Sequence, residues 1–188
     1  MLKNTDQIFT LASCLALLAA PGVFAGDRAD ELLTSGLTSG LTTGPAEVSA
    51  VVLQAPGLTV YKTPTCGCCG KWVDYMEDAG FNVTVRELRD MSSVKRDAGL
   101  PPTHQSCHTA IAADGGYVFE GHIPAKFVKA FLAEPPAGAR GLVVPAMPVG
   151  SPGMEYGNQF APYDVFLLKA DGAVEVYARV NTPADARD

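Results

Sequence analysis

Three cysteines stand within four positions in the segment VYKTPTCGCCGKW, at Cys66, Cys68 and Cys69. Cys66 and Cys69 by themselves form a C-x-x-C pair, a spacing that serves both thiol–disulfide exchange and metal binding. Both activities use the thiolate, which backbone N–H groups and the helix dipole favour at the start of a helix. The pair alone therefore leaves three interpretations open: a disulfide exchanger, a structural staple and a metal site.

The third cysteine of the cluster, Cys68, favours the metal site. A disulfide exchanger needs one attacking thiol and one resolving thiol, and a third adjacent thiol invites the wrong disulfide. Three clustered thiolates are better explained as soft metal ligands. Gly67 and Gly70 leave the backbone free to wrap around a centre.

Apolar periodicity predicts the elements that must position these cysteines. The helix that follows the cluster carries Trp72, Met76 and Ala79 on one face. The predicted elements are strand 58–62, helix 69–80, strand 82–88, helix 92–99, strands 107–112 and 117–120, and helix 123–134. This β-α-β-α-β-β-α order is that of a thioredoxin-like fold, so we predict an α/β protein with a thioredoxin-like domain at 57–134.

The rest of the chain is predicted to attach to this domain. Residues 1–25 combine a positive start, a short apolar run and a small-residue cleavage motif, as a signal peptide does. Residues 26–56 contain the repeat LTSGLTSGLTTG and predict a flexible linker. Residues 135–188 are predicted as an extension packed on the core, with a Pro/Gly-rich loop at 135–154 and a β-hairpin at 163–179.

The predicted signal peptide indicates the compartment of the protein, and its net charge limits the classes of binding partner. A cleaved signal peptide predicts export, to the periplasm, where disulfides are permitted. After cleavage we expect no membrane span, because no later segment is apolar enough. The formal net charge of −6 argues against nucleic-acid binding, which needs a basic surface. We expect a monomer.

A fourth cysteine, Cys107, begins the third predicted strand. In the thioredoxin arrangement, the segment that enters this strand lies against the C-x-x-C motif and usually carries a cis-proline. In HQSCHT, Cys107 stands about where that proline is expected. A thiol in place of a shielding ring favours metal binding, with Cys66, Cys68, Cys69 and Cys107 meeting at one point.

The ligand type selects the metal. Four cysteines suit zinc or an iron–sulfur centre in principle, but zinc ribbons use two separated C-x-x-C knuckles. Iron–sulfur centres need maturation before export, which an ordinary signal peptide does not indicate. Soft thiolate ligands select Cu(I). We therefore predict bound copper as Cu(I), and because thiolates can bridge several Cu(I) ions, the prediction includes a multinuclear cluster.

Histidine and methionine side chains are further candidate ligands: His108, Met147, Met154, His104 and His122. In a strand, His108 would point to the opposite face from Cys107, so a structural role or a hydrogen bond to a ligand is the alternative. The other two histidines could line the site or be solvated at the surface. The two methionines lie in a long loop, where their thioethers could bind Cu(I) or fill apolar gaps.

Four segments, in this order, are similar to one known family: YKTPTCGCCGKW, GLPPTHQSCHT, GHIPA and VPAMPVGSPGME. They resemble the CopG-type copper-resistance proteins, which are exported thioredoxin-like proteins with a C-x-C-C motif. The resemblance covers about residues 57–180. It implies copper binding through Cys66, Cys68, Cys69 and Cys107, a role in copper tolerance, and Cu(I)/Cu(II) interconversion as a candidate activity. Other periplasmic copper-handling proteins are the candidate partners.

Two other functions stay open at this point. In a thiol–disulfide oxidoreductase, Cys66 would attack and Cys69 would resolve. In a structural module, two disulfides would staple a binding domain, although the adjacency of Cys68 and Cys69 makes that pairing difficult. The residues do not decide whether copper is stored, passed on or changed in oxidation state, so catalysis stays an open question.

Overall fold

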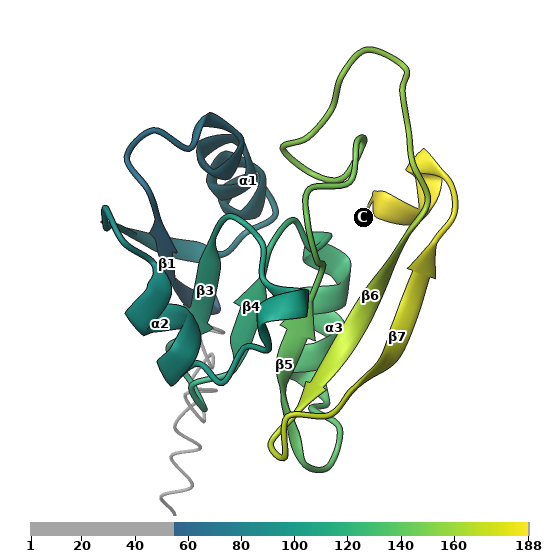
Figure 1. The fold of residues 1–188 in the computed structure, drawn as a ribbon. Helices are drawn as coiled ribbons and strands as arrows, with labels where there is room; N and C mark the ends of the chain where they lie inside the picture. Colours follow the sequence, from purple (N-terminus) through teal and green to yellow (C-terminus); the bar gives the residue numbers. More distant parts are fainter. Residues whose placement is uncertain (1–54, 188) are drawn as a thin grey trace, which may run out of the picture. The chain divides into compact units, whose positions relative to one another are not determined.

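A seven-stranded mixed sheet runs through residues 55–187, the part of the chain that this computed structural model describes (Figure 1). The strands lie in the order β2-β1-β3-β4-β5-β6-β7. They are β1 (Gly57–Lys62), β2 (Asn82–Glu87), β3 (Thr109–Ala112), β4 (Val118–Glu120), β5 (Ala139–Val143), β6 (Tyr163–Lys169) and β7 (Val174–Val180). The β1–β2 and β4–β5 pairs are parallel, and the other pairs are antiparallel.

The helices connect these strands. They are α1 (Gly67–Asp78), α2 (Ser92–Asp97) and α3 (Ala125–Ala133), with short 3₁₀ turns η1 (Pro102–His104) and η2 (Pro183–Ala186). From β1 to α3 the observed order is β-α-β-α-β-β-α, as the apolar pattern predicts. The prediction of an α/β protein is confirmed for the described residues.

Two predictions from the sequence concern residues that precede residue 55. The predicted signal peptide (1–25) and residues 26–54 of the predicted linker lie outside the described residues. Between residues 55 and 187, none of the helices combines the length and the apolar character that a membrane crossing requires.

Amphipathic patterning explains α1, the helix that carries the cysteine cluster. Trp72, Val73 and Met76 are buried against the sheet, while acidic side chains face solvent. The helix stops before Gly80, whose φ of +91° is a left-handed conformation that glycine adopts without strain. This burial fixes the orientation of the helix and hence the position of its first turn.

Apolar side chains cover both faces of the sheet. On one face, Phe119 and Leu142 belong to the large core beneath α1 and α3. Their neighbours Val118 and Val143 point the other way, into a smaller cluster with Ala98 and Leu100 after α2. Helices α1 and α3 are also joined directly, since the Ala125 N–H donates to the Tyr75 hydroxyl at 2.9 Å, and the Trp72 indole N–H donates to the Ile123 carbonyl just before α3 at 3.0 Å. Figure 1 shows α2 in front of the sheet and α3 behind it.

Residues after α3 continue the same sheet. The predicted hairpin is present as β6 and β7. The prediction of a loop over 135–154 is wrong at 139–143. These residues form β5, which pairs in parallel with β4. Gly141 permits this pairing, since a Cβ at that position would overlap the Val118 carbonyl on β4. The sheet therefore extends three strands beyond β4.

Candidate metal centre

The start of α1 positions three of the four candidate cysteines. The chain leaves β1 at Lys62 and turns, and the Cys66 N–H donates to the Thr63 carbonyl at 3.1 Å. Cys66 is the N-cap residue, so Cys68 and Cys69 fall in the first helical turn. The first helical turn leaves backbone N–H groups without intrahelical partners, and the positive end of the helix dipole lies there.

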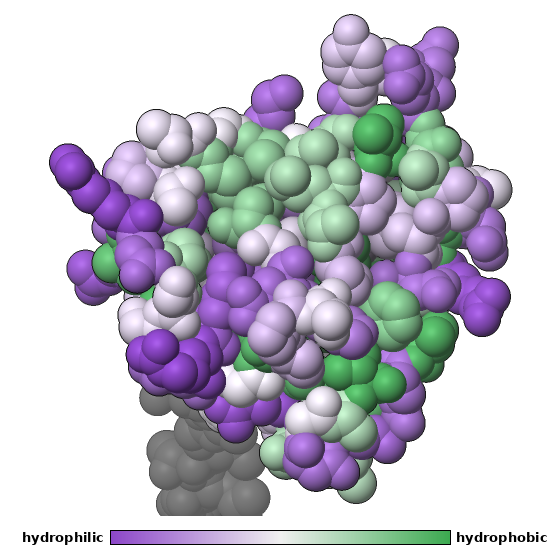
Figure 2. Space-filling view, viewed as in Figure 1, coloured by the Kyte–Doolittle hydropathy of each residue, from purple (hydrophilic) through white to green (hydrophobic). Residues whose placement is uncertain are grey.

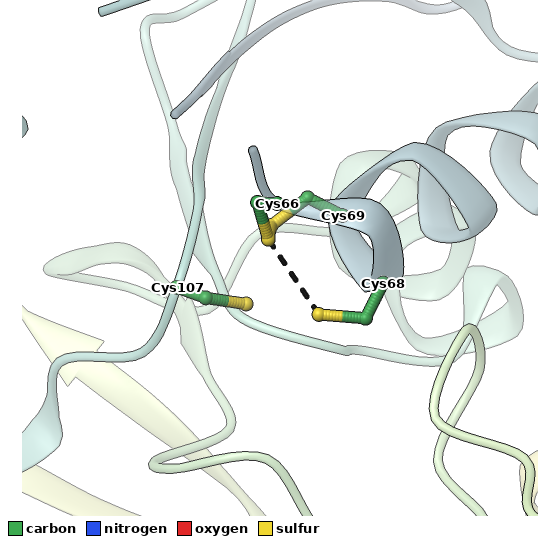
Figure 3. Close-up of side chains that lie close together, drawn as sticks. All are labelled: Cys66, Cys68, Cys69 and Cys107. Atoms are coloured by element: carbon green, nitrogen blue, oxygen red, sulfur yellow. Dashed lines mark hydrogen bonds between the residues drawn. A yellow bond between two sulfur atoms is a disulfide. The ribbon is translucent and has the colours of Figure 1, made fainter. Parts of the chain in front are cut away.

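Cys107 reaches the same place from another part of the chain. It lies just before β3, and β3 runs antiparallel to β1, so the segment entering β3 lies beside the segment leaving β1. The sulfurs of Cys66, Cys68, Cys69 and Cys107 all lie within 4.8 Å of one another. In Figure 3 the Cys68 and Cys107 side chains point toward each other. The structure thus brings the four predicted cysteines together, while their role as metal ligands stays a prediction.

Two of these four sulfurs are bonded to each other. A disulfide joins Cys66 and Cys69, with their Cα atoms 5.4 Å apart. Cys68 and Cys107 are free thiols, and the Cys68 sulfur lies 3.5 Å from that of Cys66 (dashed in Figure 3). Disulfide sulfurs are not thiolate ligands. A centre that uses all four cysteines therefore requires reduction of the Cys66–Cys69 bond.

Two buried histidines flank the Cys107 sulfur. It lies 3.1 Å from Nε2 of His122 and 3.5 Å from Nδ1 of His108. Nδ1 of His122 lies 2.7 Å from the Pro152 carbonyl, which can only accept, so Nδ1 carries the proton and donates. Nε2 is then the acceptor for the Cys107 S–H. The His108 ring packs between Trp72 and His122, with ring centroids at 4.4 and 4.9 Å. Cys107, His108 and His122 thus form a second group of metal-binding side chains.

The expectation that His108 faces away from Cys107 is wrong. It assumed that both residues belong to a strand, whereas β3 begins only at Thr109. Strand alternation therefore does not apply to the Cys107–His108 pair. Burial is the largest effect that lowers the pKa of His108 and of His122, which leaves both rings neutral and able to act as ligands at neutral pH.

The remaining candidate ligands, His104, Met147 and Met154, differ in their contacts and in their exposure to solvent. His104 packs edge-on against Phe166, with ring centroids 5.6 Å apart, and it belongs to neither group of metal-binding side chains found among residues 55–187. Met147 is 48% exposed on the loop that leaves β5, and Met154 is half-buried in the same loop. The role of these two methionines as copper ligands stays a prediction.

The loop between β5 and β6 covers one side of the cluster. Gly153 lies flat on the first turn of α1, where a Cβ would come within 2.8 Å of the Cys68 carbonyl and 2.9 Å of the Trp72 nitrogen. Cys66, Cys68 and Cys107 nevertheless remain partly exposed, whereas Cys69 is buried. Figure 2 shows weakly hydrophobic surface, in pale green, where α1 approaches this loop. Three of the four cysteines are therefore partly accessible to solvent.

The metal-free Cys107 thiol is expected to react slowly at neutral pH. Burial, reinforced by Cys68, raises its pKa from 9.0 to about 11, so the protonated form persists far above neutral pH. Since each pKa unit changes the thiolate fraction tenfold, alkylation at pH 8 should be about a hundredfold slower than for an exposed cysteine. Alkylation rates of Cys107, measured by peptide mass spectrometry across pH, check this. A rate that already levels off near pH 9, as expected for the unfolded chain, would contradict it.

Comparison with known proteins places these features in a family. Two solved structures, titled copper resistance protein CopG in forms 1 and 2, are each 38% identical to the chain. The form 1 match has a TM-score of 0.62 and covers 66% of this chain and 97% of that one. The form 2 match has a TM-score of 0.63 and covers 67% and 98%. A family model described as "Protein of unknown function, DUF411" matches residues 104–154, and a search among curated proteins found no match.

Proposed function

The chain belongs to the family of the CopG copper resistance proteins, and from this premise we propose that it binds copper as Cu(I) through Cys66, Cys68, Cys69 and Cys107. The observation that carries the proposal is the convergence of these four sulfurs within 4.8 Å. Soft thiolates prefer Cu(I), and one thiolate can bridge two ions, so this ligand set suits a multinuclear centre. Copper is the cargo of the site.

The Cys66–Cys69 pair supports a redox step in the same proposal. Oxidation of two thiols to a disulfide releases two electrons and two protons. Two Cu(II) ions that take one electron each become two Cu(I) ions, which the free thiols of Cys68 and Cys107 can receive. An external thiol reductant then returns the disulfide to the dithiol. The chain would in this way reduce Cu(II) to Cu(I).

Nitrogen and thioether ligands complete the proposed set. His122 offers Nε2 on the Cys107 side, where its tautomer is fixed by Pro152, and His108 lies next to it. Imidazole nitrogen suits both oxidation states of copper better than thiolate alone. Met147, which is exposed, and Met154, which is half-buried, are proposed as thioether ligands from the loop between β5 and β6.

The proposed setting is the periplasm. The predicted signal peptide supports export, and the family supports a place among copper-handling proteins, which are the proposed partners. We further propose that residues 57–134 are a thioredoxin-like domain with 135–188 as its extension, and that the protein is a monomer. The strand order β2-β1-β3-β4, with α1 and α3 on one face and α2 on the other, supports the fold proposal.

Copper loading should depend on the oxidation state of the Cys66–Cys69 pair. The dithiol protein offers four thiolates and the disulfide protein only two, so we expect the copper bound per chain to fall by about half or more on oxidation. Elemental analysis with thiol counts, on protein purified from copper-supplemented cells, checks this. Equal copper in both states, or none in the dithiol state, would contradict the four-cysteine site.

A second candidate function is thiol–disulfide oxidoreduction by Cys66 and Cys69. The specific observation in its favour is the disulfide at the N-terminus of α1, a place where the helix dipole stabilises the attacking thiolate. This function uses only the C-x-x-C pair. Copper binding also uses Cys68 and Cys107, so these two thiols separate the two functions.

A further inference from the structure

A lysine–glutamate pair is buried close to the segment that carries Cys107. Glu120, the last residue of β4, is fully buried, and Lys95 of α2 is 7% exposed. The Lys95 ammonium donates to Oε1 of Glu120 and, at 3.3 Å, to the Thr109 hydroxyl. Burying two charges costs free energy that a well-packed apolar pair would not cost. Stability alone therefore does not explain why this pair is buried.

The Glu120 carboxylate binds both sides of the Cys107–His108 dipeptide. Its Oε1 accepts a hydrogen bond from the Ser106 N–H at 2.6 Å, immediately before Cys107. Its Oε2 accepts one from the Thr109 hydroxyl at 2.6 Å, immediately after His108. One rigid group thus fixes the two ends of the dipeptide that presents a thiol and an imidazole to the cluster.

The backbone around Glu120 adds further ties to the same segment. The Gly121 N–H donates to the His108 carbonyl at 3.1 Å. A Cβ on Gly121 would overlap the Val144 carbonyl and come within 2.8 Å of the Ser106 side chain, so only glycine allows this approach. The Ser106 hydroxyl donates to the Ala146 carbonyl on the loop that leaves β5. The Cys107 segment is therefore held between β4 and this loop.

We propose that Glu120 is a positioning residue for Cys107, with Lys95 as the counterion that permits its burial. The carboxylate fixes the Ser106–Thr109 backbone so that the Cys107 sulfur reaches the three sulfurs at the start of α1. This inference rests on the proposed copper site for its consequence. Its structural content, the position of the Cys107 thiol, can be measured without copper.

Two double variants separate the hydrogen bonds from the charges. In Lys95→Met/Glu120→Gln, the amide oxygen still accepts from the Ser106 N–H, and the amide N–H₂ can donate to the Thr109 hydroxyl. In Lys95→Met/Glu120→Leu, an apolar side chain of similar size removes both bonds. Neither variant leaves a buried unpaired charge. The Leu variant leaves the Ser106 N–H and the Thr109 hydroxyl without their acceptor, so its melting temperature is expected to lie below that of the Gln variant.

The readouts are Cu(I) affinity of the reduced protein, by competition with a chromogenic chelator, and the alkylation rate of Cys107 in metal-free protein. The Leu variant should lose about tenfold or more in affinity, the usual cost of removing a group that orients a ligand, and Cys107 should alkylate several-fold faster. The Gln variant should stay within about twofold of the wild type. Equal values in the two variants would overturn the proposal.

A milder pair of variants covers the case in which the Leu variant does not fold. Thr109→Val removes the hydroxyl that donates to Oε2, whereas Thr109→Ser keeps it. Faster Cys107 alkylation in the Val variant alone supports the proposal, and identical rates in both refute it. Glu175→Gln, which breaks the exposed Lys169–Glu175 pair between β6 and β7, serves as the surface control and should change neither readout.

Failure of the inference and failure of the proposed function give different results. A wild-type protein that binds no copper in its reduced form refutes the copper site. Cys107 alkylation in the same metal-free samples still decides whether Glu120 positions the thiol. If the wild type binds copper and the two Lys95/Glu120 double variants behave alike, only the positioning role is refuted.

Discussion

The Cys68→Ala/Cys107→Ala double variant is expected to lose copper while its Cys66–Cys69 pair continues to exchange disulfides. The two removed thiols are the free ones, and neither takes part in the disulfide. Two thiolates from one helical turn offer half the ligands of four converging thiolates, so copper per chain should fall by about half or more. Elemental analysis gives the copper, and reduction of a disulfide substrate gives the exchange rate.

The matched control removes the other two cysteines. Cys66→Ala/Cys69→Ala should lose both exchange and most copper, because it takes two ligands and the whole redox pair. If the Cys68→Ala/Cys107→Ala protein keeps its copper, the four-cysteine site is wrong. If no variant and no wild-type sample contains copper but exchange persists, thiol–disulfide oxidoreduction is the better description.

Replacing Gly141 by alanine is expected to give the largest loss of stability among the glycine variants. The added methyl group would overlap the Val118 carbonyl, a backbone atom that cannot move without breaking the β4–β5 pairing. We expect the free energy of unfolding to fall by about 3 kcal/mol or more, the upper range for overpacking a core. Urea unfolding of the purified variant measures this.

Gly70→Ala is the matched control for that substitution. Gly70 lies inside α1, and a Cβ there would have no neighbour within 4 Å. Alanine in a helix interior should raise stability by about 0.5–1 kcal/mol relative to glycine. Similar unfolding free energies for the two variants would show that β5 tolerates a side chain at residue 141 and would contradict the close β4–β5 contact.

Local patterns in the sequence predicted the elements around the cluster well. Strand 58–62 and helix 69–80 correspond to β1 and α1 with shifts of one or two residues at their ends. Their signals are local, namely alternation in the strand and a buried stripe at Trp72 and Met76 in the helix. The meeting of Cys107 with the other three cysteines follows from the order of elements, which those local signals determine.

Features that depend on distant contacts were missed. The ARGLV segment of β5 is flanked by glycine and proline residues, and its pairing with β4 gives it an extended structure that its own sequence does not reveal. The exact start of β3 decides where His108 points, and strand boundaries are the least predictable feature of a pattern. Lys95 and Glu120 look like surface charges in the sequence, because only the folded sheet shows them buried together.

The separation of the four cysteines along the chain has a consequence for how the protein folds. Cys66 and Cys69 are three residues apart and can meet as soon as one helical turn forms, whereas Cys107 arrives only after β3 has paired with β1. Short-range closure is faster and costs less entropy than long-range strand pairing. During folding in an oxidising medium, the Cys66–Cys69 disulfide therefore forms first. Neither of its sulfurs is then free to form a disulfide with Cys107. The oxidised cluster is thus the natural first product of folding, and the four-thiol form is reached only afterwards, by a reductant acting on the finished fold.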